Sequence, residues 1–138
     1  EPLCVAMLDI DHFKSINDTY GHPVGDQVIR SLAWLLKGRL RASDIIGRYG
    51  GEEFIVVLRS ASLEEAESVL DRIRADFATL PHAHAAGILR ATFSAGIACF
   101  PAWTTGNDLT RAADEALLEA KRQGRNRIVR ARHGDSPQ

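Results

Sequence analysis

Two adjacent carboxylates directly follow a pair of glycines near the middle of the chain, in the run Arg48-Tyr49-Gly50-Gly51-Glu52-Glu53-Phe54. Apolar residues at 45–49 and 54–58 flank the glycines, a pattern that predicts a β-hairpin with a primed turn, in which both glycines take positive φ. Because glycine has no Cβ atom, a phosphate group can approach the backbone there. The turn therefore suggests a site for a divalent metal ion that carries a nucleotide.

A further carboxylate, Asp9, lies near the end of the apolar run 3–10, which is typical of a buried central strand. If this strand lies beside the hairpin, Asp9 and Glu52 converge. Mg²⁺ takes oxygen ligands, usually one or two carboxylates plus water and phosphate. Two such ions can flank a reacting phosphate group. Spacing alone leaves open the alternative that these are solvated turn acids.

Three basic residues could hold a triphosphate by charge-assisted hydrogen bonds, namely Lys14, Lys121 and Arg125. The alternative for Lys121 is that the helix dipole favours a cation in a last helical turn. Asn17 and Asp26 bracket a turn. A carboxylate could accept the N1 and 2-amino hydrogens of guanine, although turn formation and helix capping explain both residues equally well.

Two other residue pairs have simpler explanations. Arg41 and Asp44 fit a helix end followed by a loop acid, and His82 and His84 fit a solvent-exposed pair better than a metal site. The two cysteines, Cys4 and Cys99, lie in apolar stretches without metal-ligand spacing. We therefore expect buried free thiols in a reducing compartment.

Composition limits the classes of partner. The 138 residues suit one domain, and 17 basic against 18 acidic residues give a net charge of −1. This balance gives no reason to expect nucleic acid or a membrane surface as a partner. The basic run 125–132 lacks interleaved aromatics, so we expect it to protect an edge strand. No apolar run is long enough to span a bilayer.

The order of expected elements predicts an α+β fold, a mostly antiparallel sheet flanked by helices. Ser62 and Glu65 form a capping box at the start of one helix, and Asn107 or Asp108 is expected to cap the last one. The expected helices cover 11–20, about 25–40, 62–77 and 107–123. The expected strands cover 3–10, 45–49, 54–58, 89–99 (half-buried) and 127–131, with a loop at 81–87.

Short motifs stand in order along nearly the whole chain. They are Asp9-Ile10-Asp11-His12-Phe13-Lys14, Asn17-Asp18, Gly21-His22, Gly25-Asp26, Arg41-x-x-Asp44, the glycine turn, Ser94-Ala95-Gly96-Ile97-Ala98, Ala113-Asp114-Glu115-Ala116-Leu117 and Ala120-Lys121-x-x-Gly124-Arg125-Asn126. Together they closely resemble the GGDEF domains of bacterial diguanylate cyclases, in the Gly-Gly-Glu-Glu-Phe variant. The resemblance implies a domain over 1–131, a flexible tail over 132–138, and a fold like the palm of nucleotidyl cyclases and polymerases.

The resemblance also implies a reaction and its residues. The family condenses two GTP into cyclic di-GMP and releases two pyrophosphates. Asp9, the Ile10 carbonyl and Glu52 would hold two Mg²⁺ or Mn²⁺ ions, with Glu53 in support and Glu52 helping to deprotonate the attacking hydroxyl. Asn17 and Asp26 would bind guanine, with His22 beside them. The triphosphate would meet Phe13, Lys14, Gly50, Gly51, Lys121 and Arg125.

By the same resemblance, the domain is cytoplasmic and holds half of an active site, so a homodimer is needed for catalysis. Arg41 and Asp44, with Arg72, match an inhibitory cyclic di-GMP site. Ser68 stands where some members carry another arginine of that site, and the segment and helix that usually precede the first strand are missing. The alternative function is a non-catalytic cyclic di-GMP receptor. The intact glycine turn argues against this alternative.

Overall fold

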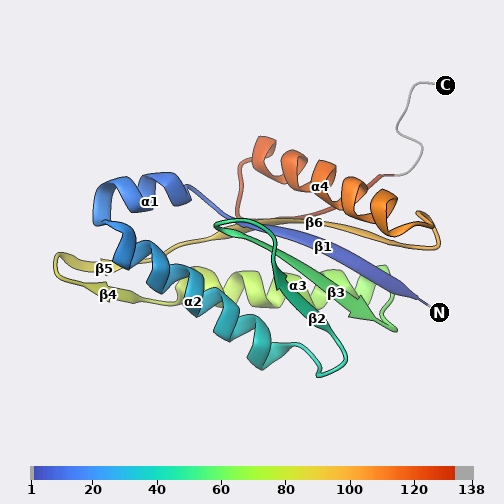
Figure 1. The fold of residues 1–138 in the computed structure, drawn as a ribbon, viewed down its shortest axis with the longest axis horizontal. Coiled ribbons are helices and arrows are strands. Elements are labelled where there is room, and N and C mark those ends of the chain that lie inside the picture. The colour runs from blue at the N-terminus through green and yellow to red at the C-terminus, as the bar shows by residue number, and fades with distance from the viewer. Residues whose placement is uncertain (1, 133–138) are drawn as a thin grey trace.

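A computed structural model describes residues 2–132. Its core is a five-stranded sheet in the order β2-β3-β1-β6-β7, antiparallel except for the β6–β7 pair, with helices on both faces (Figure 1). The predicted α+β fold is confirmed. The sheet contains β1 (Leu3–Ile10), β2 (Ile45–Arg48), β3 (Glu53–Arg59), β6 (Phe93–Phe100) and β7 (Ile128–Arg130). The helices are α1 (Phe13–Tyr20), α2 (His22–Arg39), α3 (Leu63–Thr79) and α4 (Gly106–Arg122).

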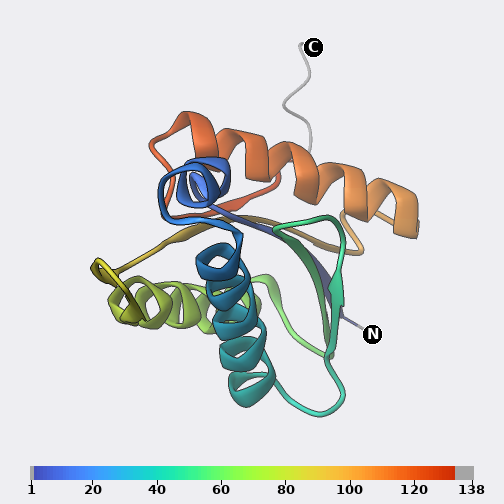
Figure 2. The same ribbon diagram turned by 60° about the vertical axis from the view of Figure 1, so that its left-hand side comes forward.

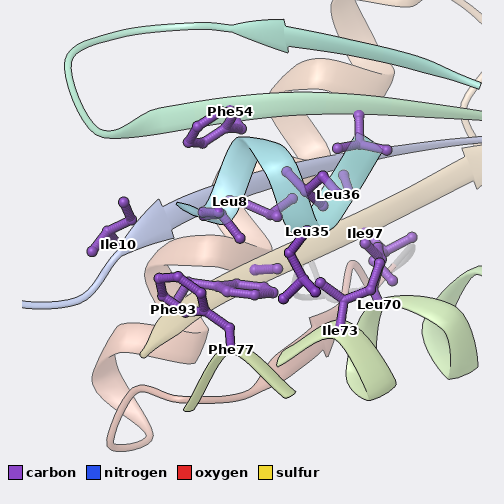
Figure 3. Packing of buried hydrophobic residues seen from close by; sticks show 14 of the residues in the cluster. Leu8, Ile10, Leu35, Leu36, Phe54, Leu70, Ile73, Phe77, Phe93 and Ile97 are labelled. Atoms are coloured by element: carbon purple, nitrogen blue, oxygen red, sulfur yellow. The ribbon is translucent and has the colours of Figure 1, made fainter. Parts of the chain in front are cut away.

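Each face of the sheet is covered by its own layer of helix. Figure 2 shows α4 on one side of the sheet and α2 with α3 on the other. Along β1, Leu8 and Ile10 enter the large cluster beneath α2 and α3, whereas Val5 and Met7 pack with α4. Figure 3 shows the larger cluster, in which aromatic and aliphatic side chains from the sheet, α2 and α3 meet. Burial on both faces explains the continuous apolar run of β1.

The strand expected at 89–99 differs from the observed strand. β6 begins at Phe93, and all but its last two residues are buried, so it is not half-buried. The reason is α4, which lies so close that a Cβ atom at Gly96 would be 2.2 Å from the carbonyl oxygen of Ala113. Glycine is therefore required where strand and helix backbones touch.

The loop expected at 81–87 is instead a small hairpin of β4 (His82–His84) and β5 (Gly87–Leu89). His82 is only 1% exposed, so the prediction of an exposed histidine pair is wrong for this residue. Its Nε2 lies 2.6 Å from the Ser31 hydroxyl and its Nδ1 lies 3.2 Å from the carbonyl oxygen of Leu89. Burial lowers the pKa of His82. The contact with α2 spans 51 residues, which local pattern could not reveal.

Helix ends follow local chemistry closely. The capping box is confirmed, with the Glu65 N–H donating to Ser62 Oγ at 3.1 Å and the Ser62 N–H donating to the Glu65 carboxylate at 2.9 Å. Three helix starts differ from expectation, and the first is that of α1, which begins at Phe13 rather than at residue 11. α2 begins three residues early, at His22, and α4 is capped by Thr105, whose hydroxyl accepts the Asp108 N–H at 3.0 Å. Thr105 fits because N-cap residues accept from the third helical position.

The cysteine prediction is wrong. Cys4 and Cys99 form a disulfide between β1 and β6, where they are directly opposite each other in the register. They are separated by 95 residues in sequence, so only the pairing of the strands brings the two sulfurs together.

Between residues 2 and 132, no helix is long and apolar enough to cross a membrane. Of the tail expected at 132–138, residues 133–138 lie outside the described residues.

Candidate active site

The end of β1 and the glycine turn meet, as the sequence predicts. β1 pairs with β3 so that Asp9 lies opposite Glu53, and the Ile10 N–H donates to the Glu52 carbonyl at 3.3 Å. Asp9 is buried on the α4 face of the sheet. The structure therefore brings together the residues predicted to hold metal, at one end of the β1–β3 pair.

The turn itself differs from the predicted primed hairpin. β2 ends at Arg48 and β3 begins at Glu53, so four residues (49–52) make the reversal, and neither Gly50 nor Gly51 has positive φ. A four-residue loop spreads the change of direction, so no two central residues need the left-handed region. A Cβ atom at Gly50 would lie 3.1 Å from Glu53 Oε1, so a side chain there would require the Glu53 carboxylate to shift slightly.

Arg48 supports this turn, a role that the sequence analysis missed. Its guanidinium donates to the Gly51 carbonyl at 2.6 Å and to the Gly50 carbonyl at 3.4 Å. The same group lies 5.8 Å from the centre of the Phe54 ring. The available signal was its position two residues before Gly50, at the end of the apolar run that precedes the glycines. Arg48 thus ties the glycine backbone to the strands on either side.

Burial, together with the charges of neighbouring carboxylates, raises the pKa values of Asp9 and Glu53. Burial raises the pKa of Asp9, and the charges of Glu52 and Asp11 raise it further, while Lys121 opposes them. Burial, then the charges of Asp9 and Glu52, raise the pKa of Glu53. Lys121 Nζ lies 2.6 Å from Asp9 Oδ2, and its positive charge partly balances the negative charge of the carboxylates. A second source of positive charge would therefore be stabilised here.

The donor set at this point fits a hard divalent cation. Asp9 and Glu52 supply carboxylates and Ile10 a carbonyl, the oxygen ligands that Mg²⁺ prefers. Among residues 2–132, no group of three or more His, Cys, Asp or Glu side chains is arranged to hold a metal. Such a sparse site suits an ion that completes its coordination with phosphate and water.

A second group of predicted residues lies where α1 meets α2. The Asn17 Oδ1 atom is buried and has no hydrogen-bond partner in the part of the chain that the structure describes. Gly25 lies against it, since a Cβ atom there would be 1.9 Å from Asn17 Oδ1 and 3.1 Å from the Phe13 ring. Asp26 and His22 are exposed in the first turns of α2. A buried acceptor without a donor invites a ligand N–H group.

The predicted cationic residues are not all brought together. Lys121, in the last turn of α4, reaches Asp9. Arg125 follows α4 with φ of 67°, and its N–H donates to the Ala120 carbonyl at 2.9 Å. Lys14 is 91% exposed and pairs with Asp18 on the outside of α1, at 2.9 Å.

The three residues predicted for an inhibitory site line one cavity of about 450 Å³ between α3 and the segment that joins α2 to β2. They are Arg41, Asp44 and Arg72, and Ser68 lines the same cavity. The Asp44 carboxylate is 1% exposed and accepts the backbone N–H groups of Arg41 at 2.9 Å and Arg59 at 3.2 Å. Arg41 also donates to this carboxylate and to the Arg59 carbonyl, yet its side chain remains 55% exposed.

This cavity is remote from the acidic turn. Arg59 pairs with Leu3, at the opposite end of the β1–β3 ladder from Asp9 and Glu53. At about 3.3 Å per residue, the strand separates the two sites by roughly 20 Å.

Comparison with known proteins identifies the family. The family model described as "Diguanylate cyclase, GGDEF domain" matches residues 1–127. The chain belongs to the GGDEF domain family. The GGDEF domain resembles diguanylate cyclase DgcP of Pseudomonas aeruginosa, at 47% identity over 91% of this chain and 19% of that protein. The chain thus spans about a fifth of the length of this curated relative.

Solved structures agree in fold. The active GGEEF domain of a diguanylate cyclase from Vibrio cholerae superposes with a TM-score of 0.89 at 38% identity, covering 96% of this chain and 84% of that one. The GGDEF domain of DgcB from Caulobacter crescentus, solved in complex with c-di-GMP, gives 0.89 at 35% identity, covering 94% of this chain and 78% of that one. The predicted family and fold are confirmed.

Proposed function

We propose that this GGDEF domain is the catalytic domain of a diguanylate cyclase, which condenses two GTP into cyclic di-GMP and two pyrophosphates. The main support is that Asp9, Ile10 and Glu52 meet at an acidic glycine turn, on the fold of a family whose named relatives include diguanylate cyclases. A domain with such a substrate belongs in the cytoplasm, where GTP is available. Neither nucleic acid nor a membrane is part of the proposal.

Divalent metal ions fit the acidic end of the β1–β3 pair. Asp9, the Ile10 carbonyl and Glu52 would hold two Mg²⁺ or Mn²⁺ ions, and Glu53 would support them. When bound, such ions neutralise phosphate charge and polarise the phosphorus–oxygen bond that breaks. Burial, followed by the charges of neighbouring carboxylates, raises the pKa values of Asp9 and Glu53, and a bound cation would favour their ionised forms.

Guanine would be bound between α1 and α2. The unpartnered Asn17 Oδ1 atom can accept a 2-amino hydrogen, which adenine lacks. Asp26 would accept the N1 hydrogen, with His22 at the rim of the same turn. Loss of a donor that satisfies a buried acceptor is costly, so this arrangement selects guanine.

The triphosphate would lie along the glycine turn. Gly50 and Gly51 leave the backbone open to it, and Phe13 closes the side near Asn17. Lys121 and Arg125 would bind its oxygens, Lys121 by exchanging its Asp9 partner for phosphate. Lys14 would need to leave Asp18 to take part, a rearrangement that its exposure permits.

The reaction joins two such half-sites. The 3′-hydroxyl of one GTP loses its proton, with Glu52 as the assisting base, and attacks the α-phosphorus of the other GTP. The bond to the β-phosphate oxygen breaks and pyrophosphate leaves with the electron pair. Two domains facing each other about a two-fold axis would hold both reactants in line, so the proposal requires a homodimer.

The cavity around Arg41, Asp44 and Arg72 would bind the product, cyclic di-GMP, and inhibit the enzyme. Arg41 presents an exposed guanidinium that suits phosphate or guanine, and Asp44 is held in place by two backbone N–H groups. A non-catalytic receptor would need only this cavity.

The test is turnover of GTP with Mg²⁺ by the domain fused to a dimerising coiled coil. We expect cyclic di-GMP from the wild type, and Glu52→Ala to lower turnover by more than about 100-fold, beyond the usual loss for an outer-shell partner. Glu115→Ala, an exposed glutamate on α4, is the matched control. Mn²⁺ binding, measured by electron paramagnetic resonance, should weaken in Glu52→Ala and stay unchanged in Glu115→Ala. Binding of cyclic di-GMP without turnover by the wild type would instead establish the receptor function.

A further inference from the structure

A buried carboxylate outside the proposed chemistry lies two residues beyond Asp9. Asp11 is 4% exposed and accepts three hydrogen bonds. The donors are the Thr92 hydroxyl at 2.7 Å, the Ser94 hydroxyl at 2.7 Å and the backbone N–H of Asn126 at 3.0 Å. Both carboxylate oxygens are engaged by protein donors, so the role of Asp11 is to hold other groups.

The group that Asp11 holds is the loop between α4 and β7. Arg125 and Asn126 have φ of 67° and 50°, both in the left-handed region that L-residues rarely adopt. Such residues persist only where their surroundings determine the conformation. Ser94 adds a second contact, since its Oγ lies 3.1 Å from the same Asn126 N–H.

The Asn126 side chain is held by a residue of another element, helix α3. Arg74, on α3, donates through Nη1 to the Asn126 side-chain oxygen at 2.9 Å. Its Nε donates to Asp71 at 2.7 Å, which orients the guanidinium on the same helix. Asn126 is therefore held by Asp11 through its backbone and by Arg74 through its side chain.

We infer that Asp11, Asn126 and Arg74 form a positioning network that fixes the left-handed loop after α4, so that Arg125 is presented to the triphosphate. Asp11 ties this loop to the end of β1 that carries Asp9, and Arg74 ties it to α3. The inference rests on the proposed function, because the role given to the network depends on Arg125 binding the phosphates of GTP.

The sharpest variant is Arg74→Ala, because this side chain bonds to Asp71 and Asn126, neither of which is assigned to metal or GTP binding. In the dimerised domain, we expect KM for GTP to rise about tenfold while kcat changes less than about twofold, the pattern of lost uniform binding. Arg111→Ala is the matched control, an exposed arginine with an aspartate three residues before it. Loss of an arginine with a purely structural role would not raise KM for GTP while leaving kcat nearly unchanged.

A second variant separates the left-handed backbone conformation of residue 126 from the contact between its side chain and Arg74. Asn126→Gly tolerates the left-handed backbone but removes the side-chain oxygen that Arg74 reaches at 2.9 Å, and leaves only the longer contact of 3.5 Å to the backbone carbonyl. We expect it to reproduce most of the KM change of Arg74→Ala, and the double variant to add little, since both changes remove the same 2.9 Å contact.

Two measurements distinguish the outcomes. Hydrogen exchange of the amides in 123–128 should accelerate in Arg74→Ala, and binding of GTP should weaken more than binding of GMP, which lacks the outer phosphates. Unchanged exchange with unchanged KM overturns the network. Equal weakening of GMP and GTP overturns its link to Arg125. Absence of GTP turnover by the wild type overturns the proposed function instead.

Discussion

At Gly25, helix propensity and site geometry oppose each other. Alanine in place of a glycine within a helix gains roughly 0.5–1 kcal/mol of stability. A Cβ atom at Gly25, however, would lie 1.9 Å from Asn17 Oδ1, so the Asn17 side chain would have to move. We expect Gly25→Ala to lower GTP affinity by at least about tenfold, the equivalent of one hydrogen bond, as measured by calorimetry.

Gly38, in the same helix, is the control, because a Cβ atom there would meet no neighbouring group of the described residues within 4 Å. Gly38→Ala should stabilise the domain and leave GTP affinity as it is. Equal GTP affinities in the two variants would remove Asn17 from the guanine site.

Glu53 provides a prediction about pH. Its pKa is raised by burial and by the charges of Asp9 and Glu52, so ionised Glu53 destabilises the folded state. In the window from its unfolded value of 4.5 to the raised folded value, the native state binds more protons and stability falls as pH rises. We therefore expect Glu53→Gln to raise the free energy of unfolding at pH 7, in urea titrations without metal.

The gain should disappear below pH 4.5, where Glu53 is protonated in both the folded and the unfolded state. A gain of the same size at both pH values would assign the effect to packing. A loss at pH 7 would mean that Glu53 is stabilised by its neighbours, contrary to its raised pKa.

Among the elements, α3 and the segment between α2 and β2 act together, because neither forms the 450 Å³ cavity alone. The Asp44 carboxylate is held by the backbone N–H of Arg41 in this segment and by that of Arg59 at the end of β3, and Arg41 can still turn toward a ligand. We expect Arg41→Ala to raise the concentration of cyclic di-GMP needed for half-inhibition by about 10- to 100-fold, as charge-assisted hydrogen bonds imply.

Inhibition assays on the dimerised domain measure this effect, with Arg111→Ala as the control. Ser68→Arg should act in the opposite direction, because Ser68 lines the same cavity and an arginine there adds a cation. Inhibition that is unchanged in Arg41→Ala would remove the cavity from product control.

For the whole molecule, the disulfide between β1 and β6 closes a loop of 95 residues. Cross-links that close long loops restrict the unfolded chain, and a stabilisation of about 2–4 kcal/mol is typical. We expect a reducing agent to lower the free energy of unfolding by this amount, as measured by urea titration. The Cys4→Ser/Cys99→Ser double variant should show no response to the reducing agent, and two free thiols in the untreated oxidised protein would contradict the bond.

Much of the fold is local enough to be predicted from sequence. The apolar run of β1, the Ser62–Glu65 capping box and the end of the first helix at residue 20 depend on neighbouring residues and are confirmed. The small hairpin β4–β5 was missed because His82 is buried by contacts with α2 and α3, which local polarity does not show. The turn type was wrong because four residues, not two, share the reversal.

The sequence by itself determined the family, the α+β class and the residue types of the site, because short motifs and local periodicity are written along the chain. Only the tertiary structure decided which of those residues meet. Strand pairing placed Asp9 beside the glycine turn and joined Cys4 to Cys99, and helix packing left Asn17 without a donor among the described residues. These contacts join residues distant in sequence, so they depend on register and packing rather than on local chemistry.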